Sequence, residues 1–189
     1  MKVFLDTEFT DFVECELVSI ALVAEDGRTF YAERSDLRRA ACSDFVRDAV
    51  LPHLGAVPGA SMTRTELALR LRAWLSALPA IEMACDSGYD RDLFADAVDY
   101  QPTPNVVAWV DLNAMAGEPA FAQAEADYHA QPGQPWHHAL HDARALRAGW
   151  VAWKSDSEAK GLAWALSFKP RGLIKPTRPT RLPGRVSIQ

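Results

Sequence analysis

The stretch ELVSIALVAEDGRTFYAE, residues 16–33, contains the pattern on which the predicted fold depends. Two mostly apolar runs flank Asp26-Gly27, a dipeptide typical of a tight hairpin turn because glycine tolerates the positive φ that such turns need. Another apolar run, residues 2–7, precedes the hairpin and predicts a further strand. We therefore expect the chain to open with a three-stranded antiparallel meander.

After the meander, predicted helices alternate with predicted strands. The strands are expected at residues 80–85 and 105–112, and the helices at 43–54 with Ser43 as a candidate N-cap, 63–78, 89–98, 115–127, 138–153 and 156–167. A meander followed by strand–helix alternation predicts an α/β fold. In this fold a mixed five-stranded sheet, with three antiparallel strands leading, is flanked by helices.

Length and composition predict one globular domain with a short arm. The chain has 189 residues, of which 49% are hydrophobic and 24% charged, as in ordinary globular proteins. We expect the domain to span residues 1–168 and a basic, proline-rich arm to span 169–189, because the arm holds six of the 20 basic residues and no acidic residue. Its four prolines disfavour a helix or a central strand there.

The sequence also predicts a cytoplasmic protein. No stretch approaches the roughly 18 uninterrupted apolar residues of a membrane span, and the first residues contain too short an apolar run for a signal peptide. The three cysteines, Cys15, Cys42 and Cys85, are odd in number and lack the spacing of a metal site. Such usage suits a reducing compartment.

Two carboxylates stand at the end of the first predicted strand, in FLDTEF, residues 4–9. Residues two apart on a strand point to the same side, so Asp6 and Glu8 project together. Carboxylates this close repel one another, and a divalent cation between them removes the conflict. Oxygen ligands suit Mg²⁺ or Mn²⁺. The alternative is a solvated strand end with two unrelated acids.

Further acids follow the fourth predicted strand, in CDSGYDRDLF, residues 85–94. Asp90 falls in the first turn of the next predicted helix, where the helix dipole favours a carboxylate. Asp86 is placed to act as the N-cap of that helix, and Asp92 faces elsewhere on it. Asp86 and Asp92 therefore compete with Asp90 as the acid that joins Asp6 and Glu8.

Three of the five histidines cluster in PWHHALHDARAL, residues 135–146. Asp142 lies in the first turns of a predicted helix, and His137 lies at its start. A zinc site built on His137, His138 and His141 is an alternative, although no second cluster of histidine or cysteine completes a tetrahedral set. Each histidine considered alone is more often a surface or hydrogen-bonded polar residue.

The ordered set DTE at 6–8, YD at 89–90 and HxxxxD from His137 to Asp142 resembles the three exonuclease motifs of the DEDD superfamily, histidine (DEDDh) subtype. The resemblance covers about residues 1–153 and is greatest to small stand-alone bacterial and phage exoribonucleases related to ribonuclease T. It implies a ribonuclease H-like fold and a metal-dependent 3′–5′ exonuclease of the exoribonuclease type that releases nucleoside 5′-monophosphates from single-stranded 3′ ends.

The resemblance also assigns roles. It implies that Asp6, Glu8, Asp90 and Asp142 bind two divalent cations, Mg²⁺ or Mn²⁺, and that His137 is the general base. It further implies a homodimer that acts on the 3′ ends of RNA or DNA. Phe9 and Trp136 are candidates to stack on the terminal base, since base stacking is tolerant of sequence; a core position is the alternative for each.

The chain departs from the family at two places. Cys85-Asp86 stands where relatives usually carry His-Asn, and His138 stands where the residue after the catalytic histidine is often arginine. Three other functions remain open: a proofreading-type DNA exonuclease, a ribonuclease H-like domain that binds nucleic acid without cutting it, and a zinc phosphohydrolase that depends on His138 or His141.

Overall fold

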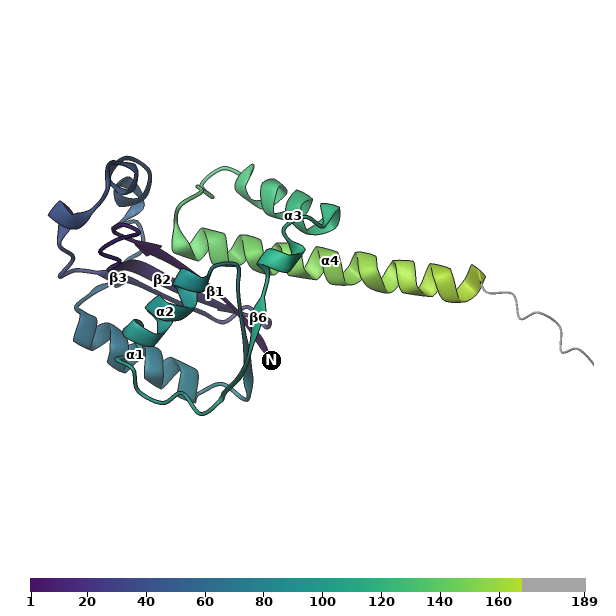
Figure 1. Cartoon of the computed structure of the whole chain (residues 1–189), viewed down its shortest axis with the longest axis horizontal. Helices are drawn as coiled ribbons and strands as arrows, with labels where there is room; N and C mark the ends of the chain where they lie inside the picture. The colour runs from purple at the N-terminus through teal and green to yellow at the C-terminus, as the bar shows by residue number, and fades with distance from the viewer. Residues whose placement is uncertain (168–189) are drawn as a thin grey trace, which may run out of the picture.

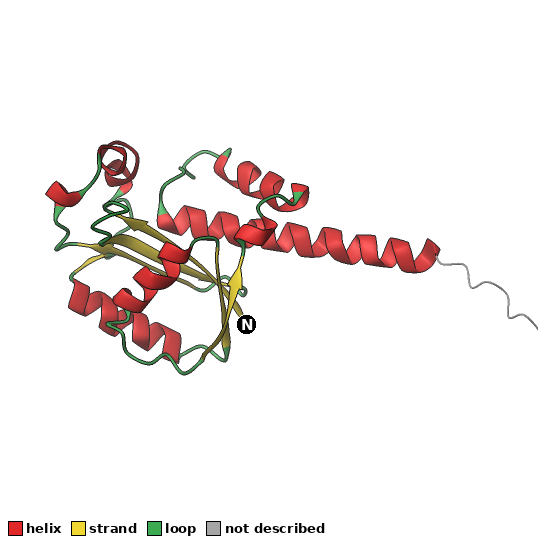
Figure 2. Cartoon of the chain, viewed as in Figure 1, coloured by secondary structure: helices red, strands yellow, loops and turns green. Residues whose placement is uncertain are grey.

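The computed structural model describes residues 1–167, with side chains as far as Gly161. It contains one mixed sheet with helices on both faces (Figures 1 and 2). The expected basic arm, residues 169–189, lies outside the described residues. The α/β class predicted from the sequence is confirmed.

The sheet has six strands in the order β4-β3-β2-β1-β5-β6. Their bounds are β1 Lys2–Phe9, β2 Leu17–Ala24, β3 Thr29–Arg34, β4 Ser61–Met62, β5 Ile81–Cys85 and β6 Val106–Asp111. β1, β2 and β3 form the expected antiparallel meander, and Gly27 has the expected positive φ of 91°. β5 and β6 are parallel to β1. The sixth strand, β4, is two residues long, too short for a sequence pattern to reveal it.

Four α-helices cover the sheet: α1 Arg64–Ser76, α2 Gly88–Ala97, α3 Pro119–His129 and α4 Ala139–Ser167. Alternate residues of β1 face two different cores. Val3 and Leu5 pack in the larger core, which includes residues of α1 and α2, whereas Phe4 packs with residues of α3 and α4. The central strand is thus covered on both faces.

Three expected helices differ from the structure. The segment predicted as a helix over 43–54 forms a π-type turn, Val46–Val50, followed by a 3₁₀ turn, Leu51–His53. Pro52 lacks an N–H for an α-helical hydrogen bond, so a regular helix cannot continue there. Ser43 does cap this segment, since its Oγ accepts a hydrogen bond from the Val46 N–H at 3.3 Å.

The two helices predicted at 138–153 and 156–167 are one continuous helix, α4, which extends well beyond the sheet (Figure 1). The Ser155-Asp156-Ser157 sequence does not end it, because each of these residues costs only a few tenths of a kcal/mol relative to alanine and no proline intervenes. Within residues 1–167, no helix has the combination of length and apolarity needed to cross a membrane.

Candidate active site

Asp6 and Glu8 of β1 lie on the face of the sheet that α4 covers. Phe4, two residues before Asp6, packs against α3 and α4 residues, and strand alternation places Asp6 and Glu8 on that same side. Asp6 pairs with Ala21 of β2, which packs against the first turns of α4. The two carboxylates therefore face the start of α4.

Asp142 meets them from the first turns of α4. Its Oδ2 accepts a hydrogen bond from the His138 N–H at 2.9 Å, and its Oδ1 is buried without a hydrogen-bond partner. Carboxylate oxygens of Asp6, Glu8 and Asp142 all lie within 4.8 Å of one another. The structure thus brings together the first and third sequence motifs.

Asp90 reaches the same place from the first turn of α2 and is only 2% exposed. Its Oδ1 accepts hydrogen bonds from the Thr7 N–H at 3.1 Å and the Thr7 hydroxyl at 2.6 Å. Its Oδ2 is buried and has no hydrogen-bond partner. Carboxylate oxygens of Asp90, Asp6 and Asp86 form a second group within 4.8 Å.

Asp86 is not the N-cap that the sequence suggested. Ser87 has that role, and its side chain accepts a hydrogen bond from the Tyr89 N–H at 3.1 Å. Asp86 instead contributes its carboxylate to the second group. Asp86 and Ser87 are adjacent residues just after β5, and the sequence pattern alone could not show which of them caps α2.

The pKa values of these carboxyl groups are all raised, and burial is the largest cause in each case. The pKa of Glu8 rises to about 8 and the pKa values of Asp90 and Asp142 rise to about 7. The pKa of Asp6 is raised well above its usual value by burial and by the charges of Asp90, Asp142 and Glu8. Two groups of crowded oxygens with unpartnered buried atoms fit divalent cations.

His137 lies where the loop from α3 enters α4. Its φ of +60° falls in the left-handed region, which is uncommon for a residue other than glycine and often marks a functional position. Its exposed imidazole meets the ring of Phe45 edge-on, with the centroids 4.9 Å apart. His137 lines a cavity of about 230 Å³ together with Asp6, Glu8 and Asp142.

Asp86, which the sequence suggested as an N-cap, also lines this cavity. Two further residues of its wall, Glu125 and His129, were not singled out from the sequence. Burial raises the pKa of Glu125 to about 7, with smaller contributions from the charges of Asp86 and Asp142. The Nε2 of His129 lies 3.2 Å from Asp142 Oδ1 but forms no hydrogen bond with it. Both α3 residues belong to a helix whose sequence pattern is weak, and no motif indicated that α3 borders the cavity.

Trp136 also lines this cavity. Its ring stacks on His129 with centroids 3.7 Å apart, yet the residue remains 54% exposed. One side of the indole is therefore supported while much of the ring faces solvent.

Phe9 lies beyond Glu8, where the pairing of β1 with β2 shifts register. Its ring stacks on Tyr89, with centroids 5.3 Å apart, and meets Phe12 edge-on. Phe12 is 71% exposed and Tyr89 is also exposed. Phe9 thus packs partly against the core and partly against a surface aromatic cluster of Phe9, Phe12 and Tyr89, outside the cavity that the carboxylates line.

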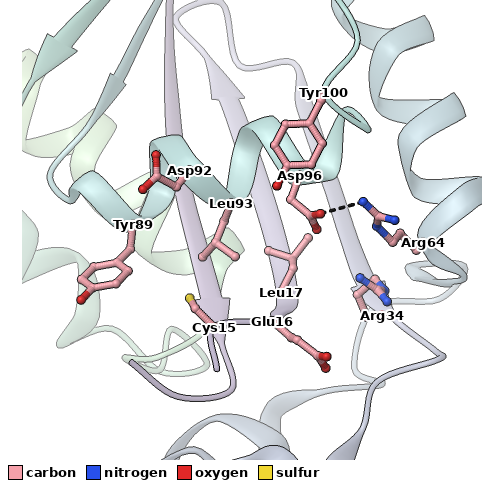
Figure 3. A pocket seen from close by; sticks show the side chains of 10 residues that line it. All are labelled: Cys15, Glu16, Leu17, Arg34, Arg64, Tyr89, Asp92, Leu93, Asp96 and Tyr100. Atoms are coloured by element: carbon pink, nitrogen blue, oxygen red, sulfur yellow. Dashed lines mark hydrogen bonds and ion pairs between the residues drawn. The ribbon is translucent and has the colours of Figure 1, made fainter. Parts of the chain in front are cut away.

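A larger cavity, of about 490 Å³, is lined in part by Tyr89 (Figure 3). It contains two arginines, but Arg64 is ion-paired with Asp96 at 2.7 Å and Arg34 with Asp36 at 2.7 Å. With Glu16 and Asp92 also in its wall, the cavity is not a basic surface for phosphate.

The other two histidines of the third motif, His138 and His141, each lie against a tyrosine side chain. His138 is buried and stacks on Tyr31, and the Nδ1 of His141 lies 3.0 Å from the Tyr128 hydroxyl. Within the part of the chain that the structure describes, the groups able to hold a metal ion consist of carboxylates alone. This arrangement does not favour the zinc alternative.

Comparison with known proteins supports the resemblance seen in the motifs. No family model matches the chain. Two curated proteins from strains of Mycobacterium tuberculosis, each named a 3′–5′ exoribonuclease, are 40% identical to it over 72 residues. That match covers 38% of this chain and 42% of each relative, so less than half of the relatives' length is represented.

Solved structures share the fold. The Mg²⁺- and Mn²⁺-bound form of S. pombe Pop2p superposes with a TM-score of 0.56, and a full-length 3′-exonuclease with 0.57. A 3′-exonuclease described as recognising the 3′ end of a histone mRNA stem-loop superposes with 0.58. Each match covers 82% of this chain and 81–82% of the other, at 14% identity. The ribonuclease H-like architecture expected from the sequence is confirmed.

Proposed function

We propose that this chain is a metal-dependent 3′–5′ exoribonuclease that removes nucleotides from single-stranded 3′ ends. The observation that carries the proposal is the convergence of Asp6, Glu8, Asp90 and Asp142 on one site, with His137 beside it. The named activity of the two mycobacterial relatives supports the exoribonuclease assignment over the part of the chain that matches.

Two divalent cations, Mg²⁺ or Mn²⁺, fit the two groups of carboxylates. Asp6, Glu8 and Asp142 would hold one, and Asp6 with Asp90 would hold the other. When bound, such a pair stabilises the attacking and leaving oxygens of an in-line displacement at phosphorus. Pop2p, which shares the fold, was solved with both of these metals.

His137 is the proposed general base. An imidazole is suited to proton transfer near neutral pH, and this one is exposed at the cavity that Asp6 and Glu8 line. An imidazole nitrogen of His137 takes a proton from the attacking water. The water oxygen bonds to phosphorus and the bond to the 3′-oxygen of the preceding nucleotide breaks. That oxygen takes a proton from solvent to become the new 3′-hydroxyl, and a nucleoside 5′-monophosphate is released.

Two aromatic surfaces flank the carboxylates and would hold the bases. Trp136 lines the cavity and Phe9 belongs to the surface cluster with Phe12 and Tyr89. Stacking of a base on an aromatic ring contributes about 1–3 kcal/mol without regard to sequence. This suits an enzyme that shortens 3′ ends of varied sequence.

The proposal is tested with 5′-labelled single-stranded RNA and DNA of the same sequence, incubated with the full chain and Mg²⁺ or Mn²⁺. We expect stepwise shortening from the 3′ end, loss of activity in EDTA, and faster shortening of RNA. His137→Ala and Asp142→Asn should each lower the rate by at least about 100-fold, the lower range for loss of a general base.

His141→Ala is the matched control, because this histidine is on the same segment but outside the carboxylate groups. Activity that survives in His137→Ala, or that depends on His141 instead, contradicts the assigned roles. Faster shortening of DNA would favour the proofreading-type alternative, and binding without shortening would favour a non-catalytic domain.

A homodimer in the cytoplasm remains part of the proposal. The three cysteines are unpaired, which agrees with a reducing compartment. β6 is an edge strand of the described sheet, and its Val107 is 63% exposed, so this edge offers apolar surface to a second copy. Light scattering after size-exclusion chromatography gives the mass in solution and tests the dimer directly.

A further inference from the structure

The register of the sheet places Asp86 level with Asp6. β5 runs parallel to β1, and Phe4 pairs with Ala84. Asp6 lies two residues beyond Phe4, and Asp86 lies two residues beyond Ala84, just past the end of β5. Because paired residues of parallel strands face the same side, both carboxylates project on the face that α4 covers.

The surroundings of Asp90 indicate that a ligand belongs between these groups. Thr7 fixes Asp90 through two hydrogen bonds to Oδ1, and this leaves the buried Oδ2 without a partner. Asp6 also has a buried, unpartnered Oδ2. Oxygens of Asp6, Asp86 and Asp90 lie within 4.8 Å of one another, a distance at which three ligand atoms can contact one cation.

Asp86 has no competing structural role among the described residues. Ser87 caps α2 in its place, and Asp86 forms no ion pair with any side chain as far as Gly161. Asp86 as a whole residue is exposed, whereas Asp90 is buried. An acid held beside two other acids without an ion-paired cation costs electrostatic free energy, which a divalent cation would offset.

We propose that Asp86 is a third ligand, with Asp6 and Asp90, of the second cation. The inference depends on the proposed function, because it adds a carboxylate to one of the two cation sites assigned there. Asp86 lies on the solvent side of this group and Asp90 on the buried side, so Asp86 completes the site at its open end. Three carboxylates bind the cation more tightly than Asp6 and Asp90 can alone.

The test is a titration of Mn²⁺ into the metal-free full chain. Isothermal titration calorimetry measures the binding, and electron paramagnetic resonance measures the Mn²⁺ that remains free. The wild type should bind two ions. In Asp86→Asn the weaker or second binding step should lose at least about tenfold in affinity, the low end of the cost of losing even an indirect partner of a metal. The other step should change little.

Asp111→Asn is the matched control. Asp111 ends β6, lines a cavity together with Asp86, and is outside both carboxylate groups. Its Oδ1 accepts a hydrogen bond from the Asn113 N–H at 2.9 Å, which an asparagine oxygen can retain. Removal of this neighbouring charge should leave both binding steps within about threefold, as expected for an exposed charge that is not a ligand.

Equal affinities in Asp86→Asn and the wild type would overturn the inference, and so would equal losses in the two variants, since this would indicate a general charge effect. A wild type that binds no Mn²⁺ would refute the proposed function itself. Circular dichroism and thermal unfolding in EDTA check that each variant is folded, and Asp86→Asn should be at least as stable as the wild type because a repelling charge has been removed.

Discussion

Thr7 lies between the two carboxylates of β1 and faces the opposite side of the strand. From there it donates two hydrogen bonds to Asp90 Oδ1, one from the backbone N–H and one from the hydroxyl. Both hydrogen bonds lower the pKa of Asp90 and so counter part of the rise that burial causes. A single small side chain thus couples the first motif to the second.

The hydroxyl of Thr7 should therefore contribute more to stability and to metal binding than its methyl group does. Thr7→Val removes one hydrogen bond to a buried carboxylate and should lower the free energy of unfolding by about 1.5–3 kcal/mol. It should also raise the pKa of Asp90 and weaken Mn²⁺ binding. Urea unfolding and Mn²⁺ titration measure the two effects. Thr7→Ser keeps the hydroxyl, and equal behaviour of the two variants would show that the hydrogen bond is unimportant.

At the scale of elements, α4 is the support that positions the third motif. Its first turns carry Asp142 toward β1, and its middle packs against α3 at Gly149. A Cβ built on Gly149 would lie 3.0 Å from three ring atoms of Phe121, which is 1% exposed. The missing side chain lets α3 and α4 approach closely, so α3 can place Glu125 and His129 at the cavity.

Gly149→Ala should therefore destabilise the protein, although alanine favours helices. Overpacking against a buried ring costs about 1–3 kcal/mol, which exceeds the gain of about 0.5–1 kcal/mol from replacing glycine in a helix. Gly161→Ala is the control, because no atom lies within 4 Å of its added Cβ. We expect opposite shifts of the melting temperature in the two variants, and a rise in both would contradict close packing at Gly149.

At the scale of the whole molecule, crowded carboxylates make the metal-free protein sensitive to pH. Glu8, with a pKa of about 8, and Asp90 and Asp142, with pKa values of about 7, hold protons in the folded state that the unfolded chain has released. Folded stability is lost as the pH rises through these values. The pKa values of His129, His138 and His141 are lowered, which makes stability rise with pH, but only below about pH 6.5.

In EDTA the melting temperature should therefore fall from about pH 6.5, above which the histidines no longer oppose the carboxyl groups, to about pH 8, the highest of these carboxyl pKa values. Mg²⁺ should raise the melting temperature most at the upper end, where the carboxylates are ionised and bind it best. Differential scanning calorimetry measures both trends. Glu8→Gln should flatten the fall in EDTA, and a wild type whose stability rises across this window would contradict the raised pKa values.

The sequence by itself determined the local elements and the order of the motifs. Alternating apolar residues and Asp26-Gly27 predicted the meander, because strand pleating and turn geometry depend on neighbouring residues. The same alternation predicted that Asp6 and Glu8 share a face. The resemblance of the ordered motifs to a known family predicted which of the 25 acidic residues would meet, and the structure brings Asp90 and Asp142 to that face.

Only the tertiary structure decided which other residues lie at the site. Asp86 looked like a helix cap, and only the parallel register of β5 on β1 aligns it with Asp6. Glu125 and His129 had no motif, and they reach the cavity because α3 packs against α4. The continuity of α4 was also missed. Distances between segments depend on packing and strand register, and these are properties of contacts between residues far apart in the chain rather than of any local pattern.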